Sequence, residues 1–285
     1  MTRPRLYDEV AEQTASIVIR RYSTSFGLAS KLLGPQVRQH VENIYALVRV
    51  ADEIVDGSGE QAGLSLLETA QALNALEAET ELAIELGFSA NLVVHAFALT
   101  ARETGFGSEL TRPFFESMRM DLTETEHDEQ SFERYVYGSA EVVGLMCLRA
   151  FVLGETVDDE ATLVRGARAL GAAFQKVNFL RDLSADFDRL GRSYFPGVRV
   201  ESFDEATKIR LLDDIDADLA VSASVLRLLP SSSRRAVALA QSLFAELARR
   251  LRATPAERLR TTRVRVPNPV KARLALGAAS GRLPT

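Results

Sequence analysis

The chain has 285 residues, of which 46% are hydrophobic and 26% charged, a composition typical of a globular protein. A single cysteine, Cys147, excludes a framework of disulfide bonds, so the reducing cytoplasm is the expected compartment. No stretch reaches the roughly 18 uninterrupted apolar residues of a membrane-spanning helix, and the first residues lack the apolar core of a signal peptide.

The formal net charge of −5 is unevenly distributed. Residues 249–285 contain ten Lys and Arg but one acid, a net charge of +9, so the preceding residues carry −14. A basic tail suits nucleic acid, anionic lipid or a phosphorylated ligand. Because no aromatic residue interrupts the tail between residues 261 and 274, we expect no binding to single-stranded nucleic acid.

In chain order, five stretches carry the hydrophobic period of amphipathic helices, and residues with high helix propensity fill them. They span residues 40–56, 64–86, 131–154, 161–190 and 231–251. Breakers separate them at 33–36, 56–63, 85–89 and 191–197, and residues 202–205 form the pattern of a capping box. No stretch alternates like a strand, so we predict one all-α domain over residues 1–285.

Aspartates four residues apart share a helix face and repel by a few tenths of a kcal/mol, so most such pairs face solvent. The chain contains three pairs: Asp52 and Asp56, Asp182 and Asp186, and Asp214 and Asp218. The third pair lies among further aspartates, Asp213 and Asp216, which spread charge around much of the helix. We interpret that pair as a solvated face.

The second pair belongs to a polar stripe on a mostly apolar helix. Asn178, Asp182 and Asp186 follow one another at intervals of four residues, and Gln175 precedes Asn178 by three. Aligned amide and carboxylate oxygens suit Mg²⁺, with Mn²⁺ as an alternative. Because Arg181 adjoins the stripe, the pattern predicts a magnesium diphosphate site.

The first pair extends this predicted site. Arg49 stands one turn before Asp52, and Tyr45 one turn earlier on the same face. Two acidic pairs on two helices of an apolar bundle can face each other across a cavity. The predicted chemistry is ionisation of an allylic diphosphate in a pocket that excludes water.

Several motifs, in this order, resemble the squalene/phytoene synthase family and in particular its bacterial phytoene synthases. They are YSTSFGLAS at 22–30, YALVRVADEIVDG at 45–57, YVYGSAEVVGLM at 135–146, FQKVNFLRDLSADFDRLGRSYFP at 174–196 and TRVRVPNPVKARL at 262–274. Each motif alone is weak, but the ordered set is specific and covers most of the chain. The resemblance implies the all-α isoprenoid synthase bundle with a central apolar cavity.

The resemblance also assigns roles to residues. Those expected to bind Mg²⁺ are Asp52, Asp56, Asn178, Asp182 and Asp186, with Gln175 lining the same site. Those expected to hold diphosphate oxygens are Ser23, Ser25, Tyr45, Arg49 and Arg181, with Arg263 and Arg265 as candidates from the tail. Residues 135–144 would line the cavity, and either Tyr135 or the released pyrophosphate would accept the proton.

The implied reaction joins two identical prenyl diphosphates head to head through a cyclopropylcarbinyl diphosphate. Geranylgeranyl diphosphate would give phytoene, the first committed carotenoid precursor, without NADPH. Farnesyl diphosphate would instead give presqualene diphosphate, dehydrosqualene or squalene. A terpene cyclase, a chain-lengthening synthase and a non-catalytic family member are the alternatives. A C40 product favours peripheral contact with the inner face of the cell membrane, and downstream carotenoid enzymes are expected partners.

Three departures from the family pattern bear on these expectations. Ala185 replaces a glutamate of the second acidic motif, but the flanking aspartates remain, so metal binding should survive. Glu141 stands where glycine is common and would narrow or polarise the cavity. Phe244 replaces a tyrosine and removes one contact to diphosphate.

Overall fold

The computed structural model describes the backbone of residues 5–190, 192–281 and 283, and the side chains of these residues except 60 and 184–190. Helices dominate the described part of the chain, and no strand occurs in it. An isolated bridge joins Glu126 to Ser193. The prediction of an all-α fold is confirmed.

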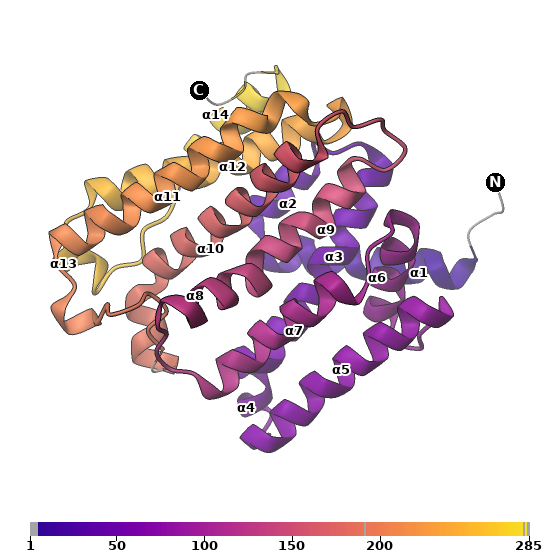
Figure 1. Ribbon diagram of the computed structural model, residues 1–285, viewed down its shortest axis with the longest axis horizontal. Helices are drawn as coiled ribbons and strands as arrows, with labels where there is room; N and C mark the ends of the chain where they lie inside the picture. Colours follow the sequence, from indigo (N-terminus) through magenta and orange to yellow (C-terminus); the bar gives the residue numbers. More distant parts are fainter. Residues whose placement is uncertain (1–4, 191, 282, 284–285) are drawn as a thin grey trace.

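The helices follow one another from the N-terminus to the C-terminus, and Figure 1 shows their arrangement. The first half contains α1 (Leu6–Tyr22), α2 (Thr24–Ser30), α3 (Pro35–Glu53), η1 (Ile54–Ser58), α4 (Gly59–Gln61), α5 (Leu66–Leu86), α6 (Leu92–Thr104) and α7 (Ser108–Thr123). The second half contains α8 (Glu129–Val136), η2 (Tyr137–Glu141), α9 (Val142–Phe151), α10 (Glu160–Leu190), η3 (Val200–Ser202), α11 (Glu205–Val225), η4 (Leu226–Leu228), α12 (Ser231–Ala253), α13 (Ala256–Leu259) and α14 (Asn268–Ala279). Elements η1 and η2 are π-helical turns, whereas η3 and η4 are 3₁₀ turns.

Local sequence explains where several helices begin and end. Ser65 and Glu68 form a capping box at the start of α5, and Gly87 ends that helix in the left-handed conformation. The capping box predicted for residues 202–205 is wrong. Asp204 caps α11 instead, because its carboxylate accepts a hydrogen bond from the N–H of Thr207.

Helix α10 is the central element of the bundle. It has 31 residues, and a helix of that length extends for roughly 46 Å. It packs against α9 and η2 on one side and against α11 and α12 on the other, as Figure 1 shows. Among the described residues, no helix combines the length and the apolarity needed to cross a bilayer.

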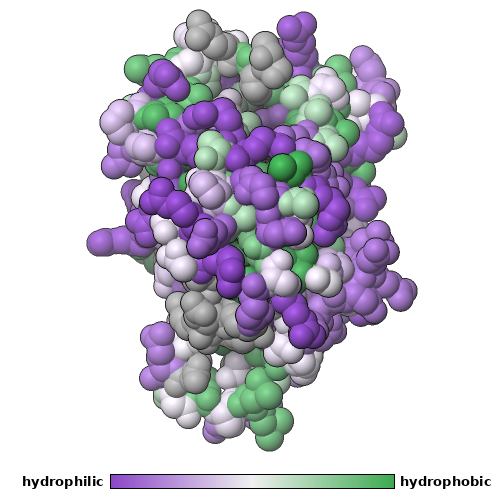
Figure 2. Space-filling view, turned by 90° about the vertical axis from the view of Figure 1, so that its left-hand side faces the viewer, coloured by the Kyte–Doolittle hydropathy of each residue, from purple (hydrophilic) through white to green (hydrophobic). Residues whose placement is uncertain are grey.

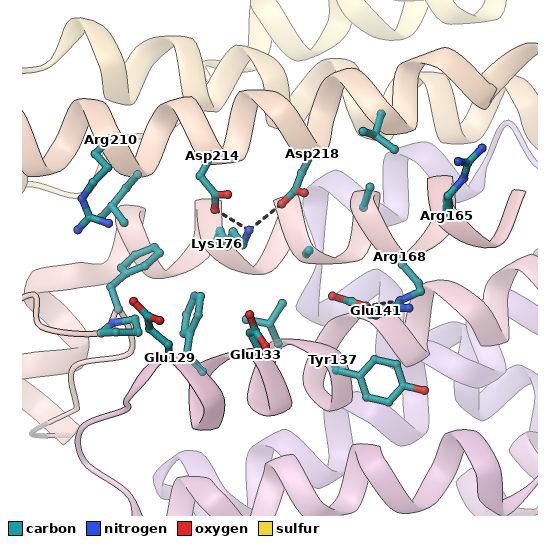
Figure 3. Close-up of a pocket in the computed structure, with 18 residues that line it drawn as sticks. Glu129, Glu133, Tyr137, Glu141, Arg165, Arg168, Lys176, Arg210, Asp214 and Asp218 are labelled. Atoms are coloured by element: carbon teal, nitrogen blue, oxygen red, sulfur yellow. Dashed lines mark hydrogen bonds and ion pairs between the residues drawn. The ribbon is translucent and has the colours of Figure 1, made fainter. Parts of the chain in front are cut away.

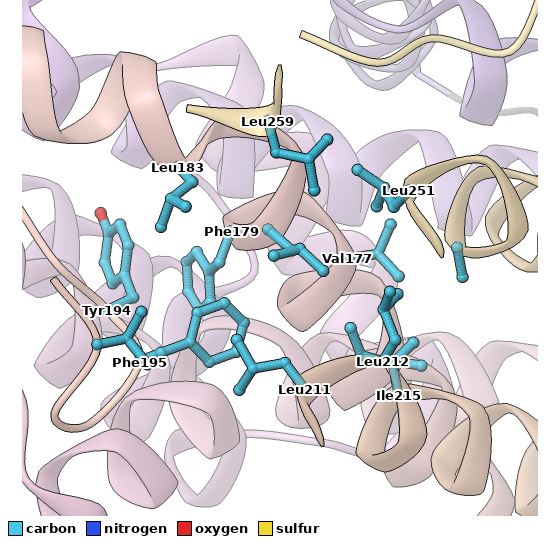
Figure 4. Packing of buried hydrophobic residues seen from close by; sticks show 14 of the residues in the cluster. Val177, Phe179, Leu183, Tyr194, Phe195, Leu211, Leu212, Ile215, Leu251 and Leu259 are labelled. Atoms are coloured by element: carbon cyan, nitrogen blue, oxygen red, sulfur yellow. The ribbon is translucent and has the colours of Figure 1, made fainter. Parts of the chain in front are cut away.

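Buried apolar side chains form two large clusters. One gathers residues of α3, α6 and α7, with Phe97, Phe114 and Phe115 among its largest members. The other lies around the C-terminal half of α10 and joins α11, α12 and α13. Figure 4 shows this second cluster, in which Phe179 of α10 stacks on Tyr194 with ring centroids 4.0 Å apart.

Small residues bring α10 close to the helix formed by α8, η2 and α9. A Cβ atom added to Gly171 would lie 2.5 Å from the carbonyl oxygen of Ala140. A Cβ atom added to Gly144 would lie 2.6 Å from the carbonyl oxygen of Ala167. Both obstacles are backbone atoms, so these glycines allow a crossing that larger residues would hold apart.

A buried lysine fixes the turn between α12 and α13. The side chain of Lys208 is 1% exposed and donates to the carbonyl groups of Arg252 (3.1 Å) and Thr254 (2.7 Å). It also pairs with Glu205 at 2.5 Å, and Glu205 accepts a hydrogen bond from the N–H of Ala256 at 3.0 Å. The orphan carbonyls at the end of α12 are thereby satisfied.

Candidate active site

The acidic residues of the first motif lie where α3 ends. Asp52 occupies the last turn of α3, and Asp56 lies on η1. Gly57 follows with φ +106°, a left-handed conformation that turns the chain immediately after Asp56. The C-terminal end of a helix carries negative partial charge, so this position attracts cations even before the carboxylates are counted.

Asp52 is paired with the arginine that precedes it by one turn. Arg49 donates to Asp52 at 2.5 Å and also pairs with Glu53. Burial and then the charge of Asp56 raise the pKa of the Asp52 carboxyl to about 7, against the opposing effect of Arg49. A cation placed between Asp52 and Asp56 would relieve this repulsion.

Asp56 is held by an arginine from another part of the chain. Arg192 donates to Asp56 at 2.9 Å and lies 3.3 Å from Asp121. It also donates to the hydroxyl of Tyr194 at 3.1 Å and to the carbonyl of Val55 at 3.1 Å. The side chain of Arg192 is 7% exposed, so these bonds fix the segment after α10 against η1.

The buried carboxyl group of Asp121 accepts hydrogen bonds from two tyrosine hydroxyls. The hydroxyl of Tyr135 donates to Asp121 at 2.8 Å, and that of Tyr194 donates to its other oxygen at 3.0 Å. Burial raises the pKa of Asp121 to about 6, against the opposing effect of Arg192. Burial and the charge of Asp121 also raise the pKa of Tyr135 well above its ordinary value. The Tyr135 phenol is therefore protonated and hydrogen-bonded to a carboxylate.

Two guanidinium groups hold the carboxylate of the second acidic motif. Arg181 donates to Asp182 at 2.9 Å, and Arg263 donates to the two oxygens of Asp182 at 2.7 and 3.1 Å. Asn178 and Gln175 lie one and two turns earlier on α10 and line the apolar cavity described below. The side chain of Asp186 lies outside the described residues.

The serines expected near the diphosphate lie at the start of α2. Ser23 caps this helix by accepting a hydrogen bond from the N–H of Phe26 at 3.0 Å, and its side chain also hydrogen-bonds Tyr45. Ser25 lies half-buried in the first turn. Tyr45 lines the cavity together with Gln175, which places α2, α3 and α10 around one opening.

The C-terminal segment that carries Arg263 runs past this opening in an extended conformation. Val264 and Val266 pack against the apolar cluster around α10, whereas Arg263 and Arg265 are exposed. This alternation is that of an extended chain, in which successive side chains point to opposite sides. Among the described residues, Arg263 is the member of this segment that reaches an acidic motif.

An apolar cavity of about 290 Å³ begins beside Asn178 and continues along α10. Its lining reaches Leu163, fifteen residues before Asn178, a rise of roughly 22 Å along the helix. Cys147 contributes to the wall, and burial raises the pKa of its thiol to about 12, so it is an inert wall residue. The lining is almost wholly aliphatic and aromatic, and such a lining excludes water.

Part of the predicted lining faces elsewhere. Ser139, Ala140 and Gly144 line the cavity as expected, but Glu141 pairs with Arg168 at 2.5 Å on the opposite side of α10. The expectation that Glu141 narrows or polarises the cavity is wrong, because the π-helical turn η2 directs it outward. Tyr135 also lies outside the lining, in the network of Asp121.

Phe244 adds an aromatic wall near the opening. Its ring stacks on that of Phe174 with centroids 3.8 Å apart, and Phe26 lies 5.7 Å from it. A tyrosine hydroxyl is absent from this stack, so the wall is apolar at the position where the family pattern has a polar group.

Within the described residues, no three His, Cys, Asp or Glu side chains form a group that would hold a metal ion. The residue types nevertheless suit Mg²⁺, since carboxylates lie on α3, η1 and α10 and the amide of Asn178 lines the cavity. Mg²⁺ is usually bound in such enzymes by one or two carboxylates, completed by substrate phosphates and water.

The comparison with protein families decides the relationship. A family model described as squalene/phytoene synthase matches residues 19–269. The chain belongs to this family.

The similar proteins within this family are named for two different products. The chain is 32% identical over 186 residues to the 15-cis-phytoene synthase of Paracoccus sp. (strain N81106 / MBIC 01143), covering 65% of this chain and 59% of the relative. It is 30% identical over 210 residues to the 4,4'-diapophytoene synthase of Staphylococcus haemolyticus (strain JCSC1435), covering 70% and 66%. The alignments therefore span less than two thirds of these curated relatives.

A solved structure confirms the isoprenoid synthase bundle. A crystal structure of a dehydrosqualene synthase in complex with ligand superposes with a TM-score of 0.78, covering 96% of this chain and 97% of that one. The two sequences are 22% identical, and the likeness concerns the fold.

This member of the squalene/phytoene synthase family also has a groove of about 950 Å³ on the outer side of α10. Figure 3 shows Lys176 on its floor, held by Asp214 (2.6 Å) and Asp218 (2.8 Å) of α11. The interpretation of this pair as a solvated face holds for Asp214, whose side chain is 58% exposed, whereas Asp218 is 24% exposed and both pair with a lysine. Lys176 lies on α10, 38 and 42 residues away in the sequence, so the sequence around the pair does not reveal it.

Asp121 is the residue that sequence reasoning missed. It lies in the last turn of α7, ahead of an acidic run that continues to Glu129, so its spacing does not set it apart. Its partners are 14 and 73 residues away, so its role emerges from the tertiary structure alone. Arg192 and Tyr194 were visible only as polar residues that follow the second acidic motif.

Proposed function

We propose that this protein joins two geranylgeranyl diphosphates head to head, through prephytoene diphosphate, to give phytoene. One observation carries the proposal: Tyr45 of α3 and Asn178 of α10, which stand two turns before Asp52 and one turn before Asp182, line one long apolar cavity. The diphosphates would lie at the polar opening and the prenyl chains along the cavity. The family membership of the chain supports the reaction class.

Each group at the opening has a proposed role. The residues that would hold Mg²⁺, or Mn²⁺ in its place, are Asp52, Asp56, Asn178, Asp182 and Asp186. The bound metal would supply charge stabilisation for the departing pyrophosphate. The residues that would bind and orient diphosphate oxygens are Ser23, Ser25, Tyr45, Arg49, Gln175, Arg181, Arg263 and Arg265. Arginine suits this task because its planar donors match phosphate oxygens two at a time.

The proton lost in the reaction would pass to the released pyrophosphate. Tyr135 lies outside the cavity lining, where its hydroxyl donates to Asp121 at 2.8 Å, so its proposed role is to position that buried carboxylate beside Arg192. The apolar cavity meanwhile keeps water from the carbocation.

The choice of a C20 substrate rests on two supports. A cavity lining that rises roughly 22 Å along α10 offers room for a long prenyl chain. Relatives named 15-cis-phytoene synthase cover about two thirds of the chain. The relative named for 4,4'-diapophytoene supports farnesyl diphosphate as the second candidate substrate. We propose no NADPH, since only the squalene branch reduces the final cation.

Product analysis tests the proposal. Purified protein would be incubated with Mg²⁺ and geranylgeranyl or farnesyl diphosphate, with and without NADPH, and lipid extracts would be analysed by mass spectrometry. We expect phytoene from the C20 substrate without NADPH and its loss in Asp52→Ala and Asp182→Ala. A C30 product would show that the substrate is farnesyl diphosphate and not geranylgeranyl diphosphate. No condensed product from either substrate would refute the reaction class.

We further propose that the protein works at the surface of a membrane, peripherally and from the cytoplasm. A C40 hydrocarbon is insoluble in water and must pass into lipid. The basic residues after position 249 provide the charge that attracts anionic headgroups.

A further inference from the structure

Arginines occupy the described carboxylates of both acidic motifs. Arg49 lies on Asp52 at 2.5 Å, and Arg192 lies on Asp56 at 2.9 Å. Asp182 is bound by two guanidinium groups, and Arg263 contacts both of its oxygens. Paired donors of this kind are among the stronger hydrogen bonds in proteins. A carboxylate has several lone pairs, but at Asp182 both oxygens hold guanidinium donors, so a metal ion must compete with arginine there.

Without diphosphate, a metal ion finds few further ligands that would favour it over the arginine. In the described part of the chain, no three acidic or His side chains converge into a ready cation site. One or two carboxylates complete an Mg²⁺ site only together with phosphate oxygens. The diphosphate supplies those oxygens, and it also gives the displaced arginines a new anion to bind.

We propose that the arginines act as place-holders that make metal binding depend on the diphosphate. Without diphosphate, they keep the carboxylates neutralised and resist free Mg²⁺. When diphosphate arrives with the metal, Asp182 exchanges Arg263 for the metal, and Arg263 moves to a diphosphate oxygen. This inference rests on the proposed diphosphate site and adds an order of binding to it.

Arg263 is the place-holder that is freest to move. Half of its side chain is exposed, whereas the Asp182 side chain is 17% exposed. The neighbouring Val264 and Val266 remain packed on the apolar cluster, so the backbone has no need to shift when the guanidinium does. By thermodynamic linkage, diphosphate and metal must increase each other's affinity for the protein by the same factor.

Electron paramagnetic resonance of Mn²⁺ tests the exchange without any turnover. The signal of the free aquo ion would be followed during titration of the full-length protein, first alone and then with inorganic pyrophosphate. Mixtures of Mn²⁺ and pyrophosphate without protein correct for chelation. The variants are Arg263→Ala and, as a matched control, Arg258→Ala, which removes an exposed arginine of α13 away from both motifs.

We expect the unaltered protein to bind Mn²⁺ at least tenfold more tightly with pyrophosphate than without. Arg263→Ala should bind Mn²⁺ alone two to five times more tightly, which is what loss of a partly exposed competing ion pair gives. Its gain from pyrophosphate should be smaller, and Arg258→Ala should match the unaltered protein. Arg263→Ala with unchanged affinity for Mn²⁺ alone would overturn the place-holder role while leaving the site intact. Absence of Mn²⁺ binding in every protein, even with pyrophosphate, would refute the proposed metal diphosphate site itself.

Discussion

Asp121 shows how one buried carboxyl group can connect distant parts of the site. It receives hydrogen bonds from Tyr135 and Tyr194 and lies beside Arg192, which in turn holds Asp56. Its side chain is 4% exposed, so water screens these interactions little. The protonation state of this residue therefore bears on both stability and the proposed chemistry.

The stability of the protein should fall as the pH rises from about 4 to about 6. In the folded state the pKa of Asp121 is raised from 3.8 to about 6, mainly by burial, so in this interval the folded protein binds a proton that the unfolded chain has lost. The difference corresponds to roughly 3 kcal/mol, fully present below the unfolded pKa and lost above the folded one. Urea unfolding between pH 3.5 and 7.5 would measure it.

Asp121→Asn should reduce that pH dependence, because it removes one titrating group while keeping one oxygen for the phenols. The part that comes from Asp52, whose pKa is also raised, should remain. Asp213→Asn, on the exposed surface of α11, is the control and should retain the slope. An Asp121→Asn protein whose stability falls as steeply as that of the unaltered protein would show that another group is responsible.

At the scale of elements, the packing of α10 against η2 depends on residues without side chains. Gly171 faces the carbonyl oxygen of Ala140, and the π-helical turn at that point directs Glu141 outward. The hydrophobic period predicted the helix over residues 131–154 but not the turn inside it. A π-helical turn accommodates one extra residue in a helix. The hydrophobic period of a single helix does not indicate how a neighbouring helix packs against it.

Gly171→Ala should destabilise the protein by about 1–3 kcal/mol, the usual cost of overpacking a core. The added Cβ atom would lie 2.5 Å from a carbonyl oxygen that cannot rotate away. Gly277→Ala in α14 is the matched control, since nothing lies within 4 Å of its added Cβ atom. Helix propensity should make that change neutral or stabilising by up to about 1 kcal/mol. Equal melting temperatures for the two variants would contradict the close crossing.

At the scale of the whole molecule, the position of the basic residues is set by the end of α12. Lys208 holds the turn after that helix, and the segment that follows carries Arg263 to Asp182. Figure 2 views the molecule from the side on which α13 lies, and hydrophilic residues cover most of that surface, with hydrophobic residues scattered among them. The basic residues after position 249 are therefore the feature that would attract an anionic lipid surface.

Binding to anionic vesicles should depend on salt and on these residues. Arg258→Glu combined with Arg273→Glu should weaken co-sedimentation with phosphatidylserine vesicles at least tenfold, since each basic residue contributes about 1 kcal/mol. Arg20→Glu with Arg21→Glu changes the charge equally on α1 and should leave binding nearly unaltered. Equal losses in both double variants would mean that net charge alone governs binding.

The hydrophobic period predicted five of the helical stretches, but not α1, α6 or α7. Spacing on periodic helices singled out Asp52, Asp56, Asn178 and Asp182, whose roles are proposals. Asp121, the capping role of Asp204 and the pairing of Lys176 were missed or misjudged. Each of these features depends on residues that tertiary packing brings together, and spacing along one helix does not predict such contacts.

The groove on the outer side of α10 has a consequence for inhibitor design. Lys176 faces this groove, while the adjoining Gln175 lines the cavity, so a single helix separates two chambers. Compounds that compete at the opening must imitate a multiply charged diphosphate and cross cell membranes poorly. A small zwitterion bound between Glu133 and Arg168 would contact the opposite side of α10. It would need neither the multiple charge of a diphosphate nor a prenyl chain.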